Sequence, residues 1–181
     1  MDYDAGCIYE SCRVKLQNGC IKMLKDLNRN DILEDGSKIV CLIKSKYSGQ
    51  LVKLNDLIIT PYHPIYFEEK WQFPIEVYSN NLKKSLPNPY YSLIDQNTKT
   101  VNVCNIVLER DHTIEIENFK VVTLGHGFEE DVVKHPYYGT NRVLEDLAKI
   151  KGWDDGLIVL NKYRVIRDEN TLVSGMLLEV N

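Results

Sequence analysis

A cysteine that follows a glycine near the start of the chain, with a Thr-x-x-His motif farther along, could attack the chain's own backbone. Cys7 follows Gly6 directly, and an apolar run leads into the motif formed by Thr60 and His63. The Cys7 sulfur could attack the Gly6 carbonyl and convert the amide into a thioester, which is an acyl shift from nitrogen to sulfur. Glycine suits this position because it leaves the carbonyl unshielded and lets the backbone bend.

The acyl shift needs help because a thioester is higher in energy than an amide. A free thiol has a pKa of about 8.5 and is mostly protonated at neutral pH. The departing nitrogen leaves poorly unless a positioned acid protonates it, which contributes about 10²- to 10⁴-fold to the rate. His63 suits that role because an ordinary histidine has a pKa of about 6.5. Thr60 could hydrogen-bond the Gly6 carbonyl or the scissile nitrogen.

Other residues of these types have plainer interpretations. Cys12 is the rival nucleophile, but it opens a strand-like run and lacks a preceding glycine, so we interpret it as structural. His112 begins another strand-like run, where an exposed histidine without a role is the plainer interpretation. His135 lies in a turn rich in proline and tyrosine and is interpreted as structural. For Thr60 and His63, the alternative is an ordinary strand end followed by a turn.

The composition fits one globular domain without a nucleic-acid or membrane partner. A chain of 181 residues has the usual size of one domain, and 44% hydrophobic residues can build a core. The net charge of -4 argues against a surface for nucleic acid or anionic membranes. No apolar run reaches the roughly 18 residues of a membrane span. No basic-then-apolar leader precedes Cys7.

The five cysteines stand at positions 7, 12, 20, 41 and 104, without a Cys-x-x-Cys pair. Structural zinc usually needs close pairs of soft ligands, and a disulfide framework is typical of small secreted proteins. We therefore expect thiols in a reducing compartment, a cytoplasmic location, no metal and no cofactor. Cys20, Cys41 and Cys104 lie in apolar strand patterns and are expected to pack as small hydrophobic residues.

Two-residue alternation dominates the first two thirds of the chain and predicts an all-β fold. Asn18-Gly19 lies between the alternating runs Cys12–Leu16 and Cys20–Met23, and predicts a hairpin with a type I′ turn. The polar stretch Ser79–Pro89 is expected to be a loop, and no helix is expected between the strands. Further strands are predicted at Ile39–Ile43, Leu51–Leu54, Leu57–Phe67, Trp71–Phe73, Tyr90–Ile94, Val101–Leu108 and Thr113–Leu124, the last turning at Glu117-Asn118.

The tail of the chain has a different pattern. Thr140 could cap a helix from about Asn141 to Lys151, with apolar residues at helical spacing and Gly152 as its stop. Strands are then predicted at Leu157–Leu160, Tyr163–Ile166 and Leu172–Val180. This tail is therefore expected to be a small α/β extension of the β-rich part.

In their order along the chain, these motifs resemble those of a Hint domain, the fold shared by hedgehog autoprocessing domains, inteins and bacterial intein-like domains. Gly6-Cys7 with Cys12–Leu16 resembles the N-terminal block of the family, and Met23–Leu33 resembles the segment that follows this block. Thr60-x-x-His63 resembles the second block, and Asn105–Gly127 resembles the C-terminal block. The run Val122–Gly127, followed by His135–Thr140, is most similar to the Vint branch, found in eukaryotic proteins with von Willebrand type A modules.

The resemblance implies an all-β, horseshoe-like Hint fold with a small C-terminal α/β extension. It implies an upstream stub (1–6), an autoprocessing domain (7–127) and an extension (128–181) packed on the same domain. The upstream polypeptide would be the substrate, and water, a thiol, an amine or a lipid could accept the acyl group. The domain would act once on its own bond, as a monomer. The implied catalytic set around Gly6 is Cys7, Thr60, His63, His112 and His126.

Full protein splicing is not expected. His126 lies near the place of the penultimate histidine of splicing domains, but Gly127 follows it where an asparagine would be needed for cleavage by cyclisation. Scission before Cys7 is the expected outcome. Two alternatives stay open: an interaction module that kept a Hint-like fold and lost its chemistry, and a cysteine hydrolase that uses Cys7 and His63 on other molecules.

Overall fold

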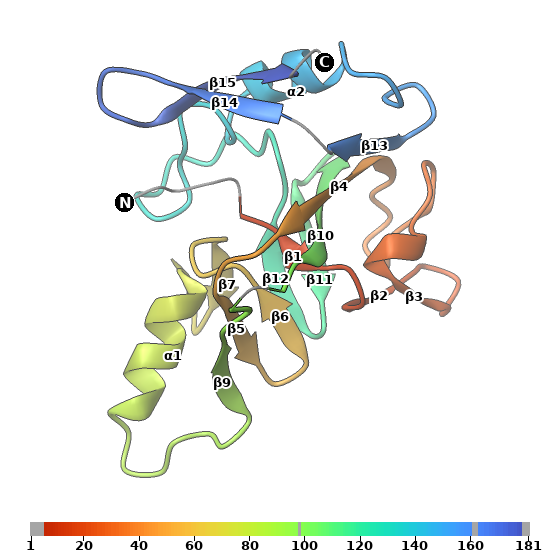
Figure 1. Ribbon diagram of the computed structural model, residues 1–181. Coiled ribbons are helices and arrows are strands. Elements are labelled where there is room, and N and C mark those ends of the chain that lie inside the picture. Colours follow the sequence, from red (N-terminus) through yellow and green to blue (C-terminus); the bar gives the residue numbers. More distant parts are fainter. Residues whose placement is uncertain (1–5, 98, 161–162, 179–181) are drawn as a thin grey trace.

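A seven-stranded sheet forms the centre of the molecule (Figure 1). The computed structural model describes residues 6–97, 99–160 and 163–178. In spatial order the strands are β13 (Leu157–Leu160), β4 (Ile39–Tyr47), β10 (Val101–Leu108), β1 (Ile8–Tyr9), β6 (Leu57–Ile59), β5 (Leu51–Leu54) and β9 (Tyr91–Ile94). Neighbouring strands are antiparallel, except that β13 runs parallel to β4.

The remaining strands of the described residues form smaller sheets. A four-stranded sheet is formed, in spatial order, by β11 (Thr113–Ile116), β12 (Phe119–Val122), β7 (Ile65–Phe67) and β8 (Lys70–Gln72). Two hairpins are formed by β2 (Arg13–Lys15) with β3 (Ile21–Met23), and by β14 (Tyr163–Arg167) with β15 (Val173–Leu178). A single 3₁₀ turn, Leu24–Asp26, follows β3. The predicted all-β fold is confirmed.

The first hairpin has a different turn from the predicted type I′. That turn requires positive φ angles at both central residues, but of the two only Gly19 has one, at 86°. The Leu16 amide donates to the Cys20 carbonyl at 2.8 Å, and the Gly19 amide donates to the Leu16 carbonyl at 3.0 Å. The connection is therefore a longer loop in which glycine supplies the left-handed residue next to the second strand.

A helix that the sequence analysis did not predict lies between β8 and β9. Helix α1 spans Pro74–Leu82, so its C-terminal part replaces the start of the predicted loop Ser79–Pro89. Pro74 is its first residue, where the missing amide hydrogen costs nothing. Val77 is buried on the inner face of the helix, and the Asn81 carboxamide accepts from the Asn88 amide at 2.9 Å. The proline that ends the β pattern thus begins a helix.

The second helix agrees with the expected start but ends earlier. Helix α2 spans Asn141–Leu147, shorter than the predicted Asn141–Lys151. The Thr140 hydroxyl accepts from the Arg142 amide at 3.3 Å, which is the predicted cap. The predicted strands of the tail form β13, β14 and β15, but positions 179 and 180 of the last prediction lie outside the described residues. Neither described helix is long and apolar enough to cross a membrane.

The first half of strand β4, Ile39–Ile43, is covered on both faces, which explains its continuous apolar sequence. Ile39 and Leu42 pack with residues of the β-rich part of the chain. Cys41 and Ile43 pack on the other face, in a second hydrophobic core with residues of the tail. That second core also contains Val107, Leu124, Tyr137, Tyr138, Val143, Leu147, Ile158, Leu160 and Val173. The tail therefore covers a face of the central sheet that would otherwise be exposed.

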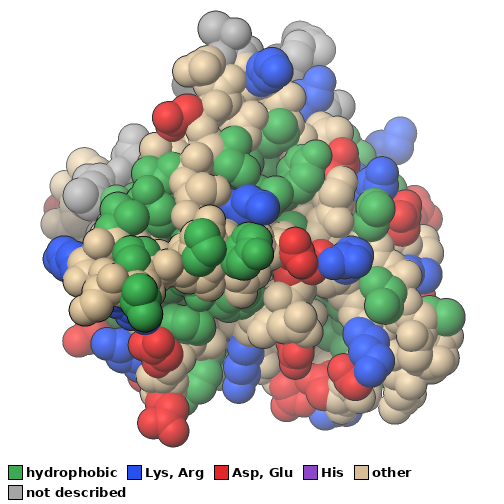
Figure 2. Space-filling view, turned by 90° about the horizontal axis from the view of Figure 1, so that it is seen from below, with side chains coloured by type: hydrophobic (Ala, Val, Ile, Leu, Met, Phe, Trp, Pro, Cys, Tyr) green, Lys and Arg blue, Asp and Glu red, His purple; other side chains and the backbone are tan. Residues whose placement is uncertain are grey.

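The surface mixes charge signs. On the face shown in Figure 2, basic and acidic side chains are interspersed among hydrophobic ones. Leu82, Leu86 and Tyr90, at the end of α1 and in the loop after it, are exposed. Exposed apolar side chains are normal for a globular protein.

We predict that the tail contributes to the stability of the whole fold. Ile158 is fully buried in the second core, whereas its neighbour Val159 is 53% exposed. In a Cys7→Ala background, Ile158→Ala should lower the free energy of unfolding by about 2–4 kcal/mol because it leaves a cavity. Val159→Ala, the matched control, should change it by less than about 0.5 kcal/mol. Chemical denaturation measures both, and equal effects would contradict a shared core.

Candidate functional site

Strand β1 carries Cys7 to the middle of the central sheet, next to Thr60. β1 lies between β10 and β6, and Ile8 pairs with Cys104 on one side and Ile59 on the other. The Thr60 amide, just after β6, donates to the Cys7 carbonyl at 2.9 Å. Two predicted site residues from distant parts of the chain are thus adjacent because their strands are paired.

Side chains hold both ends of the peptide group between Gly6 and Cys7. The Cys7 amide donates to the Thr60 hydroxyl oxygen at 2.8 Å, and that hydroxyl in turn lies 3.2 Å from the Cys7 carbonyl oxygen. The Asn105 carboxamide nitrogen donates to the Gly6 carbonyl oxygen at 2.6 Å. Of the two contacts expected for Thr60, the structure contains the one to the Cys7 nitrogen, and Asn105 makes the one to the Gly6 carbonyl.

Asn105 is the functional candidate that the sequence analysis missed. It lies on β10, is 5% exposed, and interrupts an otherwise apolar run from Val103 to Leu108. Its Oδ1 accepts from the Ile106 amide at 3.0 Å, which turns Nδ2 towards Gly6. A buried amide in a strand core is costly unless it is hydrogen-bonded. The sequence therefore shows that Asn105 is an unusual polar residue in an apolar strand, but it does not show which group Asn105 contacts.

His63 lies directly against Gly6. A β-carbon added to Gly6 would overlap the His63 Cβ and lie 2.5 Å from its Cα, closer than real atoms approach. Part of the obstacle is backbone, so a larger residue could be placed only by moving the turn that carries His63. Glycine is therefore required before Cys7 by packing as well as by flexibility.

The His63 ring is neutral at neutral pH. Burial lowers its pKa to about 4, and the nearby Val122 and Gly6 backbone only partly opposes this. His63 Nε2 lies 2.7 Å from the Val122 carbonyl oxygen, and since a carbonyl only accepts, Nε2 carries the proton. Nδ1 then has a free lone pair, buried without a hydrogen-bond partner among the described residues. The expectation of an ordinary pKa is corrected: the neutral His63 ring can accept a proton at Nδ1, and it could donate that proton only after taking it up.

The other histidines gather near His63. His126 is 8% exposed, and its pKa is lowered to about 4 by burial and by the proximity of His112, His63 and His135. Its Nδ1 accepts from the Phe128 amide at 2.9 Å, so it binds the loop that follows it. His112 was interpreted as exposed, but it is half-buried, and its Nδ1 has no partner among the described residues.

His135 stabilises its own turn, as the sequence suggested. Its Nδ1 accepts from the Tyr137 amide at 3.1 Å and from the Tyr138 amide at 3.0 Å. Burial lowers its pKa to about 4, so the ring is neutral at neutral pH. Because Nδ1 is occupied as an acceptor, the ring proton is on Nε2, which is buried and has no partner within the described part of the chain.

The cysteines differ in exposure. Burial raises the pKa of Cys12 and Cys41 to about 11 and that of Cys104 to about 12, so these thiols stay protonated at neutral pH. Cys7 is half-buried. Cys20 is exposed, and its interpretation as a packed hydrophobic residue was wrong, because the longer hairpin loop leaves it at the surface. Within the described ranges, no cluster of three or more His, Cys, Asp or Glu could hold a metal ion.

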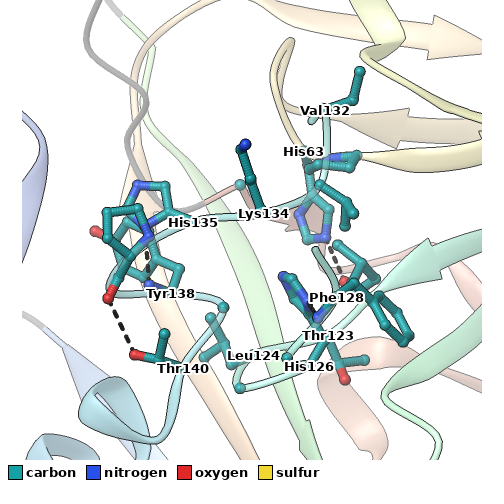
Figure 3. A pocket seen from close by; sticks show the side chains of 18 of the residues that line it. His63, Thr123, Leu124, His126, Phe128, Val132, Lys134, His135, Tyr138 and Thr140 are labelled. Atoms are coloured by element: carbon teal, nitrogen blue, oxygen red, sulfur yellow. Dashed lines mark hydrogen bonds between the residues drawn. The ribbon is translucent and has the colours of Figure 1, made fainter. Parts of the chain in front are cut away.

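A cavity of about 860 Å³ opens beside Gly6. Its walls come from the turn at His63, the end of β12 and the loop that leads to α2, with Leu172 from the tail. Figure 3 shows His63 on one side of this space and His135 and Tyr138 on the other, with Leu124 between them. The predicted residues His63 and His126 therefore share one cavity with Gly6, whereas His112 is not part of its lining.

A family model described as Vint, a Hint-domain, matches residues 6–175 of the chain. The structure is similar to the crystal structure of the gp41-1 intein, with 12% identity, a TM-score of 0.47, and 66% of this chain and 100% of that chain covered. A DnaB intein from Synechocystis sp. PCC 6803 has 15% identity and a TM-score of 0.45, covering 66% of this chain and 99% of that one.

A bacterial intein-like domain from Clostridium thermocellum has 14% identity and a TM-score of 0.47, covering 65% of this chain and 97% of that one. No curated protein sequence matches the chain.

The buried neutral histidines predict a loss of stability in mild acid. Histidine in an unfolded chain has a pKa of about 6.5, whereas the pKa of His63, His126 and His135 is lowered to about 4. The unfolded chain thus binds more protons between these values, so stability is present above about pH 6.5 and is lost as pH falls towards 4. Urea midpoints of the Cys7→Ala protein should fall across this range.

Nuclear magnetic resonance titration of the imidazole protons provides the direct measurement. The His63 ring should stay neutral at pH 5, and His63→Gln should make the acid loss of stability less steep. A titration midpoint above pH 6 for His63 would contradict its assignment as a buried neutral base.

Proposed function

The chain belongs to the Vint family of Hint domains, and we propose that it cleaves its own backbone between Gly6 and Cys7 through a thioester. Hint domains are self-processing domains, and the proposal assigns that activity to this one bond. The observation that carries it is the peptide group held at both ends, by Thr60 at the nitrogen and by Asn105 at the carbonyl oxygen.

In the proposed first step, the Cys7 sulfur attacks the Gly6 carbonyl carbon while the thiol proton passes to His63 Nδ1. The neutral ring and the buried, unpaired lone pair of Nδ1 support this assignment. Negative charge develops on the Gly6 oxygen, which already accepts a hydrogen bond from Asn105 at 2.6 Å. A donor placed in advance at a developing oxyanion is often a major contribution to catalysis.

In the second step, the tetrahedral intermediate loses the Cys7 nitrogen as a free amine. His63 returns its proton to that nitrogen, the carbon–nitrogen bond breaks, and a thioester joins Gly6 to the Cys7 sulfur. A histidine with a pKa of about 4 is a weak base but a strong acid once protonated. Its proton transfer therefore favours departure of the nitrogen, which is the more difficult part of the shift.

Release of the upstream polypeptide completes the proposed reaction. Water, a thiol, an amine or a lipid attacks the thioester, and the Cys7 thiol is regenerated with a free amino terminus. The residue after His126 is Gly127. Since glycine has no side-chain amide that could attack its own carbonyl, the proposed outcome is scission before Cys7 without splicing.

We predict that a precursor with a longer polypeptide before Gly6 splits directly before Cys7. Dithiothreitol or hydroxylamine should accelerate the split because both attack thioesters, and mass spectrometry identifies the new ends. Cys7→Ala should abolish scission, because no other atom is placed to form the thioester. Cys20→Ala, which removes the exposed thiol of the hairpin loop, is the matched control and should leave the rate unchanged. A precursor that stays whole with both nucleophiles would reject this function.

The contacts also predict unequal effects of the supporting residues on the scission rate. His63→Ala should slow it by about 10²- to 10⁴-fold, the usual contribution of a positioned acid or base. Asn105→Ala should slow it by about 10²- to 10³-fold, because an oxyanion donor is lost. Thr60→Ala removes the hydrogen bonds of the hydroxyl to the Cys7 amide and to the Cys7 carbonyl, and each should cost about 0.5–1.5 kcal/mol.

Asn102→Ala is the control for Asn105, because Asn102 lies on the same strand, is exposed, and contacts Glu10. It should leave the rate unchanged. Rates are measured by the disappearance of the precursor at a fixed thiol concentration. Equal rates for the Asn105 and Asn102 variants would mean that the carbonyl contact does not contribute to the reaction.

A further inference from the structure

The cavity beside Gly6 is larger than the proposed acyl shift needs. Of the residues that line this space of about 860 Å³, the proposed reaction uses Gly6, His63 and Asn105. This volume lies within the range of sites that bind sizeable ligands, roughly 300–1,000 Å³. Cys7 is not among the lining residues. The cavity therefore lies on the upstream side of the scissile bond.

Three buried polar atoms of the lining have no hydrogen-bond partner within the described residues: His63 Nδ1, Thr123 Oγ1 and His135 Nε2. Thr123 is only 3% exposed although it lines the cavity. Buried polar groups are rarely left unpaired, because their desolvation costs free energy that a hydrogen bond would offset. Their presence around one cavity points to a polar occupant.

The unpaired atoms differ in kind. His63 Nδ1 can only accept in the neutral ring, because Nε2 donates to the Val122 carbonyl. His135 Nε2 can only donate, because Nδ1 accepts from two backbone amides. The Thr123 hydroxyl can do both. An occupant that satisfies all three must present donors and acceptors at separate points along its length.

We propose that this cavity binds the polypeptide segment that immediately precedes Gly6, and that it selects which upstream sequences are released. A peptide presents an N–H donor and a C=O acceptor at each residue, which matches the mixed set of unpaired atoms. Covalent continuity favours the same occupant: successive Cα atoms are about 3.8 Å apart, so the chain before Gly6 starts at the cavity. This inference rests on the proposed function, since it assigns the substrate of that reaction.

The apolar part of the lining would receive the side chains of the segment. Leu124, Phe128 and Val133 contribute to it, and Tyr138 stands on the far wall. Most of these residues belong to the loop before α2, and Leu172 comes from the tail. The tail would thus have a second role beyond covering β4, namely to complete the site that holds the upstream polypeptide.

Photochemical cross-linking of an uncleavable chain tests where the upstream segment binds. The full chain with Cys7→Ala carries p-benzoylphenylalanine in place of Tyr3, a position that reaches at most about 11 Å from Gly6. Irradiation should give cross-links to residues 123–140, identified by mass spectrometry. The same probe in place of Ile21, which is exposed on the first hairpin, is the control and should not label that loop. Cross-links from position 3 only to other regions, or none at all, would overturn the proposal.

This experiment does not depend on cleavage. If precursors never split but the cross-links form, the proposed function fails while the binding site remains. If precursors split but the cross-links are absent, the binding site fails while the function remains. The two outcomes are therefore distinguishable.

Thr123→Val provides a kinetic test with two readouts. Loss of one hydrogen bond to the upstream segment should slow scission by about 2- to 10-fold. In the Cys7→Ala protein that starts at position 7, the same substitution should keep or raise the thermal stability, because it removes an unpaired buried hydroxyl. Thr113→Val, on β11 and outside the cavity, is the control and should not change the scission rate.

An unchanged scission rate for Thr123→Val together with a loss of stability would show a purely structural hydroxyl and overturn the proposal. The proposal would also be overturned if the scission rate saturated with increasing concentration of an apolar amine and Thr123→Val weakened this saturation. A small acceptor, and not the upstream polypeptide, would then be the occupant of the cavity.

Discussion

The pairing of the two-residue strand β1 between β10 and β6 is the constraint on which the site depends. Through it, Thr60 from the end of one neighbour and Asn105 from the middle of the other reach opposite ends of the same peptide group. Neither side chain could find this position by local structure, since their strands are far apart in sequence. The seven-stranded sheet therefore brings polar residues that are distant in sequence into one site. The two hydrophobic cores that pack against the sheet stabilise this arrangement.

Burial is used here to set protonation as well as to stabilise the fold. An imidazole in water near neutral pH is a mixture of charged and uncharged forms. The enclosed position of His63 removes the charged form, and the Val122 carbonyl fixes which ring nitrogen carries the proton. The cost is a buried lone pair without a partner among the described residues. Unpaired polar groups of this kind are expected where a reacting molecule later supplies the partner.

The sequence predicted the parts of the site that depend on residue type and order, and not those that depend on strand pairing. Cys7, Thr60 and the all-β fold follow from local patterns, and the structure brings Cys7 and Thr60 into contact. Asn105 could be recognised as an anomalous polar residue, but its target became visible only once β10 lay beside β1. Helix α1 was not predicted, because Pro74 directly follows the predicted strand Trp71–Phe73 and proline ends a strand as readily as it begins a helix. The protonation state of His63 depends on burial by segments far from it in sequence, which no local pattern contains.

Under the proposed cleavage, the close approach of His63 to Gly6 has a consequence for the polypeptide that is released. Because the obstacle to a side chain at position 6 includes backbone atoms, the residue before the cut is fixed even where the sequence farther upstream varies. Every product of such a domain would then end in glycine, as an acid, an ester or an amide according to the acceptor. A terminal glycine is small and achiral, and its carboxyl carbon is open to further enzymes. The packing inside the domain would thus give every released polypeptide the same C-terminal residue.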